Sequence, residues 1–340
     1  MKKKILVIII ILLLIVLYCA WSIFGPTVNA PEEKYLFIKT GSVYNDVKKA
    51  LLEKRIISTS FFFDNIAKQV HYTSNVKPGR YEIKNGSNIV NLLRMLKSGR
   101  QSPVRLVINK LRTKEDLAQK IGSNFESDSA DIIKFITSND SLATYGLDTN
   151  TVMTAIIPNT YLLQWNSSFK KLFTRLKAEQ EKFWTKDRKQ KANLLQLSQA
   201  EVYSMASIVE EETNKAEDKG KIASVYINRI QKGMKLEADP TVKYAMRNFG
   251  LKRILRGHLS YPSDYNTYLH TGLPPGPICT ASAKTIDAVL NAPNTSYIFF
   301  VAKPDFRGFS NFASTYPEHL VYAKAYQHAL DSLILSKQMK

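Results

Sequence analysis

The sequence predicts an α+β protein with three parts: a single N-terminal transmembrane helix, one or two small α/β modules, and a larger mixed α+β domain. Three observations lead to this prediction. A long apolar run opens the chain, a pattern of strand, glycine turn and helix recurs in the first third, and amphipathic helices fill much of the second half. With 340 residues, 44% of them hydrophobic, the chain can form cores of this size.

The apolar run at residues 5–24 (ILVIIIILLLIVLYCAWSIF) contains no charged side chain. A helix of that length is about 30 Å long, which matches the hydrocarbon core of a bilayer. Residues 2–4 are lysines, which the positive-inside rule keeps in the cytoplasm. We therefore expect a cytoplasmic tail at 1–4, a span of the cell (inner) membrane at 5–24, and a linker at 25–34 that leads to an extracytoplasmic or periplasmic remainder.

A cleaved signal peptide is the alternative reading of this run. Its apolar core would usually hold only about 7–15 residues. The nearest cleavage-like site, residues 28–30 (VNA), is followed by Pro31, which hinders cutting. Tyr18 is too large for a lipoprotein cleavage site ahead of Cys19, so we predict an uncleaved anchor. Because Cys19 lies in the apolar run and Cys279 is the only other cysteine, we predict no intramolecular disulfide.

A weak internal repeat predicts the small modules. Residues 37–42 (FIKTGS) and 82–87 (EIKNGS) each read as a short strand and a glycine turn before a Ser-capped, apolar-periodic helix. Residues 104–108 and 113–116 (TKED) repeat the pattern. We expect one module at 35–102, a second small α/β segment at 103–165, and the larger domain at 166–340, with a basic amphipathic helix over 169–195.

One helix in the larger domain carries three consecutive glutamates. Residues 198–201 (SQAE) form a capping box, so the helix begins there. On a helical wheel the buried stripe centres on Val202, Glu211 falls opposite in solvent, and Glu210 and Glu212 fall on the two shoulders. A shoulder half-desolvates a carboxyl, which raises its pKa and leaves it open to a substrate. Periodicity leaves Glu210 and Glu212 as candidate acids, and a solvated acidic helix end is the plain alternative.

The most specific motifs lie in order between residues 206 and 311. They are residues 206–213 (ASIVEEET), 223–229 (ASVYINR), 236–242 (LEADPTV) with Tyr244, 265–268 (YNTY), 272–278 (GLPPGPI), 297–301 (YIFFV) and 309–311 (FSN). This series resembles the endolytic murein transglycosylases of the YceG-like (MltG) family. The anchor, a first repeat that looks like a LysM module, and residues 158–161 (PNTY) extend the resemblance over nearly the whole chain.

The resemblance implies a peptidoglycan lytic transglycosylase whose catalytic residue is Glu212, the second glutamate of a Glu-x-Glu-Thr pattern. Such an enzyme cleaves the bond between N-acetylmuramic acid and N-acetylglucosamine in nascent strands and closes a 1,6-anhydro ring, which would terminate strand elongation. The implied partners are peptidoglycan glycan strands, with peptidoglycan synthases as further candidates. Glu211 stands where the family often has Lys or Arg, and Asn159 stands where its turn usually has Asp.

Further side chains of this series carry amides, hydroxyls, carboxyls or rings that suit sugars. We predict substrate binding by Glu210, Thr213, Asn228, Asp239, Thr241, Tyr265, Asn266, Thr267, Tyr268 and Asn311. No metal and no cofactor are predicted, because the five histidines form no His-Glu-x-x-His pair and no phosphate-binding glycine loop occurs.

Three other functions remain open to the sequence. A lysozyme-like hydrolase would use Asp239 as a second carboxylate. A non-catalytic peptidoglycan-binding scaffold would need only the small modules. Nucleic-acid binding is raised by the net charge of +19, most of it before residue 198, but we predict no nucleic-acid partner, because the chain lacks a recognition motif and the anchor places the basic half outside.

Overall fold

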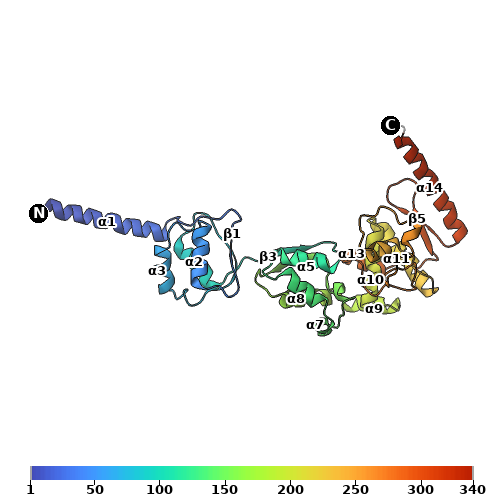
Figure 1. The fold of residues 1–340 in the computed structure, drawn as a ribbon, viewed down its shortest axis with the longest axis horizontal. Helices are drawn as coiled ribbons and strands as arrows, with labels where there is room; N and C mark the ends of the chain where they lie inside the picture. The colour runs from blue at the N-terminus through green and yellow to red at the C-terminus, as the bar shows by residue number, and fades with distance from the viewer. Residues whose placement is uncertain (1, 339–340) are drawn as a thin grey trace. The chain divides into compact units, whose positions relative to one another are not determined.

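A computed structural model describes residues 2–338 of the chain. They form two compact units. Unit 1 contains the chain up to residue 106 together with Gly122–Asp128 and Tyr161–Phe169, and unit 2 contains Val107–Ile121, Ser129–Thr160 and the chain from residue 170. Helices and short antiparallel strands occur in both (Figure 1), which confirms the α+β prediction. The predicted domain boundaries and the LysM-like character of the first module stay predictions.

The first helix, α1 (Lys2–Phe24), carries the apolar run. None of its residues is buried, and its mean hydropathy reaches 3.1, so by length and composition it is a candidate membrane span. The amide of Gly25 donates to the carbonyl of Trp21 at 2.7 Å, and the helix ends there.

Unit 1 then folds around a two-stranded sheet. Its further elements are β1 (Tyr35–Ile38), α2 (Tyr44–Glu53), α3 (Phe61–Gln69), β2 (Gly79–Glu82) and α4 (Ile89–Ser98). The strands pair antiparallel, with Tyr35 opposite Glu82. The expected serine cap of α4 is wrong by one residue: Asn88 is the N-cap, and its Oδ1 accepts from the amide of Asn91 at 2.8 Å.

Two strands, β3 (Val104–Ile108) and β4 (Asn159–Leu163), form a second small sheet. The helices α5 (Lys114–Gly122), α6 (Ser129–Ile136), α7 (Asn139–Ala143), η1 (Val152–Ala155), α8 (Phe169–Phe183) and α9 (Lys186–Leu194) lie around and after them in sequence. The single helix expected over residues 169–195 is wrong. Two helices occur because Thr185 caps a new one, its Oγ1 accepting from the amide of Arg188.

The rest of unit 2 carries the glutamate helix. Its elements are α10 (Gln199–Glu212), α11 (Ala216–Gln231), α12 (Asp239–Ala245), η2 (Arg256–His258), α13 (Ala283–Leu290), β5 (Phe299–Ala302), β6 (Ser310–Ala313) and α14 (Tyr316–Gln338). Strands β5 and β6 pair antiparallel, and α14 packs on them.

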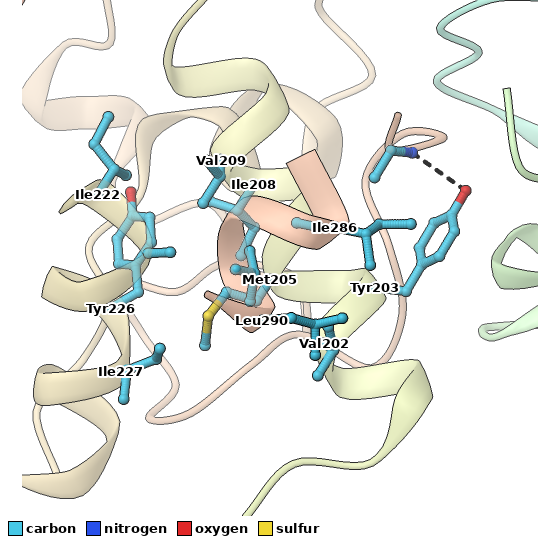
Figure 2. Packing of buried hydrophobic residues seen from close by; sticks show 14 of the residues in the cluster. Val202, Tyr203, Met205, Ile208, Val209, Ile222, Tyr226, Ile227, Ile286 and Leu290 are labelled. Atoms are coloured by element: carbon cyan, nitrogen blue, oxygen red, sulfur yellow. Dashed lines mark hydrogen bonds between the residues drawn. The ribbon is translucent and has the colours of Figure 1, made fainter. Parts of the chain in front are cut away.

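Helix α10 is the central helix of this core. Every residue from 202 to 209 is buried, and the helix packs against both α11 and α13. Figure 2 shows Met205 and Val209 of α10 between Tyr226 of α11 and Ile286 of α13. The predicted capping box is confirmed, since Ser198 Oγ accepts from the amide of Glu201 while the Glu201 carboxylate accepts from the amide of Ser198. A helix that is buried over residues 202–209 therefore ends at Glu212.

Candidate active site

The carboxyl of Glu212 ends α10 and is half-buried. The hydroxyl of Tyr226, a fully buried residue of α11, donates to Glu212 Oε1 at 2.7 Å. Burial raises the pKa of the Tyr226 hydroxyl well above its ordinary value, so this group keeps its proton and acts as the donor. Among the described residues Glu212 forms no ion pair.

The surroundings of Glu212 favour its protonated form. Burial raises the pKa of its carboxyl to about 7; the nearby charges of Asp239 and Glu211 add to this rise, and the Tyr226 hydrogen bond and Lys243 oppose it. The C-terminal end of a helix dipole also disfavours negative charge. Near neutral pH the group can therefore hold a proton and can also take one back.

Glu212 lines a cavity of about 340 Å³. The cavity is bounded by α11, the segment that leads into α12, β5 and the start of α14. Its walls are formed by Glu212, Val225, Arg229, Leu236, Glu237, Asp239, Tyr268, Ile298, Phe299, Phe300, Tyr316 and His319. Aromatic rings, two further carboxylates and one guanidinium thus face the same space as the raised carboxyl, a mixture suited to a polar ligand with flat apolar faces.

The second carboxylate beside Glu212 is Asp239, the first residue of α12. Its Oδ1 accepts from the hydroxyl of Tyr268 at 2.7 Å. Burial and this hydrogen bond raise the pKa of Tyr268 far above its ordinary value, so the tyrosine keeps its proton. The pair places a fixed phenol and a carboxylate on one wall of the cavity.

The other two glutamates of α10 lie outside this cavity. Glu210 accepts from Lys219 and Ser282 at 3.0 Å each, and from the Thr285 hydroxyl. Although burial raises its pKa, these hydrogen bonds and the Lys219 charge lower it below its ordinary value. The prediction that Glu210 binds sugar therefore stays a prediction, without a place on the cavity wall.

The expectation that Glu211 faces solvent is wrong. Its side chain is only 16% exposed, and both of its oxygens accept from Arg112, at 3.0 Å each. Lys110 lies 3.2 Å away on the same carboxylate. The wheel assumed a surface helix with one wet face, whereas α10 is central and its far side meets these two cations.

The sequence and the fold of the chain both match known proteins. The YceG-like family matches residues 36–325. The chain belongs to the YceG-like family. The crystal structure of a yceG-like protein from Listeria monocytogenes matches 84% of this chain and 97% of that one, with 27% identity and a TM-score of 0.56.

Two relatives are named endolytic murein transglycosylases. The one from Bacillus subtilis is 44% identical over 116 residues, which are 34% of this chain and 31% of the relative. The one from Streptococcus pneumoniae is 26% identical over 315 residues, which are 81% of this chain and 55% of the relative. This YceG-like chain thus spans between about a third and about half the length of the curated relatives that it matches.

Of the residues predicted from sequence, only Glu212, Asp239 and Tyr268 line the cavity. Several others hold the backbone behind it. Thr241 and Thr267 share a hydrogen bond of 2.9 Å, and Thr267 Oγ1 accepts from the amide of Ala238 at 3.0 Å. Asn266 is fully buried and donates to the carbonyls of residues 259 and 261. These contacts fix the segments that carry Asp239 and Tyr268.

The remaining predicted residues make contacts outside the cavity. Asn228 donates to the carbonyls of residues 295 and 297 at 2.8 Å each, which ties α11 to the segment before β5. Thr213 accepts from the amide two residues on, and Asn311 pairs with Val301 across the β5–β6 sheet. The Tyr265 ring packs against Tyr244, centroids 4.8 Å apart. None of these four lines the cavity.

Sequence reasoning missed the group that touches the acid, Tyr226, and most of the aromatic wall. Tyr226 and Arg229 lie in the 223–229 motif, but nothing in its pattern separates a tyrosine that meets Glu212 from one that fills the core. His319 comes from the C-terminal helix, where burial lowers its pKa and favours the neutral ring. No local pattern links that helix to residue 212.

Proposed function

We propose that this protein is a membrane-anchored endolytic lytic transglycosylase that cleaves the bond between N-acetylmuramic acid and N-acetylglucosamine in nascent peptidoglycan. The observation that carries the proposal is the half-buried carboxyl of Glu212, whose pKa is raised to about 7 and which faces a cavity lined by rings and polar groups. Family membership and the names of the two relatives support the same activity.

In the first step the protonated Glu212 donates its proton to the oxygen of the scissile glycosidic bond, and the leaving sugar departs with it. The carboxylate left behind then removes the proton of the C6 hydroxyl, whose oxygen closes the 1,6-anhydro ring. The proton returns to Glu212, so the enzyme is regenerated without water. A pKa near the working pH serves both halves of this exchange.

Tyr226 and Asp239 support these steps in different ways. Because Tyr226 donates to Oε1, the proton of Glu212 is held on the other oxygen, Oε2. The negative charge of Asp239 favours the protonated acid before cleavage, and it can stabilise positive charge that develops on the sugar ring. Asp239 itself is oriented by Tyr268.

The compartment is part of the proposal. With α1 in the cell membrane and Lys2, Lys3 and Lys4 in the cytoplasm, the rest of unit 1 and all of unit 2 would lie outside, where glycan strands are made. Cleavage within a strand that is still being extended would end its elongation, and peptidoglycan synthases would then be its neighbours.

Mass spectrometry of the products tests the proposal. Purified glycan strands are incubated with the wild type, with Glu212→Gln, and with Glu217→Gln as a matched control, because Glu217 is an exposed glutamate of α11. We expect anhydro-ended fragments from the wild type and the control, and none from Glu212→Gln. Reducing ends would instead support the lysozyme-like hydrolase, with Asp239 as second carboxylate. Full activity of Glu212→Gln would refute the assignment, and strands bound but never cut by the wild type would support the scaffold.

A further inference from the structure

Helix α3 opens with three phenylalanines that differ in their surroundings. Phe63 is fully buried in the core of unit 1, Phe62 is half-buried, and Phe61 is 67% exposed. The ring of Phe62 meets the ring of Tyr18 on α1 edge to face, with centroids 6.2 Å apart, and Phe61 packs on Phe62 at 5.2 Å. The start of α3 therefore lies beside α1 at the level of Tyr18.

Tyr18 lies well before the C-terminal end of the apolar helix. Tyr18 precedes Phe24 by six residues, which is about 9 Å along a helix. A membrane-spanning helix needs about 20 apolar residues to cross the hydrocarbon core, and residues 5–24 supply that number. If the core ended at Tyr18, only residues 5–17 would remain, a length of roughly 20 Å. If α1 spans the membrane, Tyr18 and the residues beside it therefore lie within the bilayer.

We propose that the part of unit 1 that follows α1 docks on the outer face of the membrane, with Phe61 and Phe62 inserted beside α1 at the boundary between headgroups and acyl chains. The partner is the phospholipid bilayer itself. Aromatic rings favour this boundary, and amphipathic helices enter it to a depth of roughly 5–10 Å. Insertion moves the exposed ring of Phe61 from water into an apolar environment, which is favourable.

Hydrogen bonds at the end of α1 hold it to the rest of unit 1. The hydroxyl of Thr27 donates to the carbonyl of Ser22 at 3.2 Å, and Asn88, the N-cap of α4, donates to the carbonyl of Phe24 at 3.3 Å. Helix α1 also packs against α4. Unit 1 is thereby seated on the bilayer surface instead of trailing on a free linker. The proposal rests on insertion of α1 and is independent of the activity proposed for unit 2.

Quenching of tryptophan fluorescence tests the proposal on the full-length protein. The protein is placed in nanodiscs of phosphatidylcholine, either plain or brominated in the upper part of the acyl chain. The variant Phe61→Trp adds one indole at the proposed site, and Leu162→Trp adds one at an apolar position of β4 with nearly the same exposure, 66%. Of the three native tryptophans only Trp21 lies on α1, so the quenched fraction of the wild-type fluorescence reports whether that helix is inserted.

We expect the brominated lipid to quench the indole added at position 61 about as strongly as Trp21 and its emission to shift to the blue. The indole added at position 162 should show neither effect. A wild type that is quenched, together with an added indole at position 61 that is not, overturns the docking while leaving the anchor intact. A wild type without quenching overturns it on other grounds, since α1 is then outside the bilayer. Neither result changes the expectation for glycan cleavage.

Discussion

Two neighbouring environments at the end of α10 shift the pKa of glutamate in opposite directions. Outside the cavity, hydrogen bonds from Thr285 and Lys219 lower the pKa of Glu210 despite the opposing effect of burial. At Glu211 the hydrogen bond from Arg112 lowers the pKa in the same way. At the cavity, Glu212 meets a phenol and a second carboxylate, and burial raises its pKa to about 7.

The helix dipole cannot explain this difference, because all three glutamates lie in the last turn of one helix, where negative charge is unfavourable. The partners explain it. Two carboxylates are neutralised by cations from other segments, and the third is left to hold a proton. Charged partners on other segments, and not the glutamates themselves, therefore separate structural acids from a candidate catalytic acid.

The largest effect on activity is expected when a glutamate of α10 is replaced by glutamine, once at the cavity and once outside it. Glu212→Gln removes the group that both gives and takes the proton, so the rate of strand cleavage should fall by about 10³-fold or more. Glu210→Gln leaves Lys219 without its carboxylate and should lower stability, by about 1–3 kcal/mol, while keeping most of the activity. Initial rates by liquid chromatography, with thermal melts of both variants, measure the two effects. A dead Glu210→Gln beside an active Glu212→Gln would reverse the assignment.

The pH dependence of cleavage sharpens the comparison. Because Glu212 must be protonated to act as an acid, activity should decline as pH rises through about 7. Tyr226→Phe removes a hydrogen bond that stabilises the carboxylate, so the pKa should rise and the alkaline limb of the profile should move to higher pH.

The measurement is the pH profile of kcat for the wild type and Tyr226→Phe. A merely structural role for Tyr226 would lower the rate at every pH and leave the limb where it is. A limb that moves to lower pH would contradict the hydrogen-bond argument outright.

The same shift predicts a stability cost at the cavity. The pKa of Glu212 is about 7 in the folded chain against an ordinary value of 4.5, so between these values the folded state holds a proton that the unfolded state has lost. Stability therefore falls as pH rises from about 4.5 to about 7, by on the order of 3 kcal/mol at most. Glu212→Gln removes this cost. At pH ~8 the variant should therefore unfold at a higher denaturant concentration than the wild type, and at pH ~4 at a similar one.

Denaturant unfolding at these two pH values measures the difference. Glu217→Gln, an exposed exchange of the same atoms, should show no pH-dependent gain. Equal stability of wild type and Glu212→Gln at both pH values would mean that the raised pKa does not exist.

Local patterns predicted much of this molecule. The capping box at Ser198 gave the start of α10, and the apolar run gave α1, because both signals depend on residues close in sequence. The motif series also led to Glu212, Asp239 and Tyr268, all three of which line one cavity.

The failures at the site come from contacts between separate segments. Glu211 was expected in solvent because a wheel cannot know that Arg112, 99 residues earlier, covers that side of α10. Tyr226 and His319 were missed because only the packing of α11 and α14 brings them to Glu212 and its cavity. The division of residues 169–195 into two helices was a local signal, Thr185, that the apolar stripe concealed.

The smallest expected effect compares two arginine–glutamate pairs. Arg112→Ala removes a two-pronged partner from Glu211, which is 16% exposed at an unfavourable helix end, so it should cost about 1–2 kcal/mol, with Lys110 limiting the loss. Arg247→Ala removes a pair with Glu115 whose side chains are 47% and 61% exposed, and it should cost less than about 0.5 kcal/mol. Chemical denaturation in low and high salt measures both, and salt should weaken only the Arg247–Glu115 pair appreciably, because solvent ions screen exposed charges most. Equal costs would show that burial of the Glu211 carboxylate adds nothing, and the contrast between the two environments of α10 would then rest on Glu212 alone.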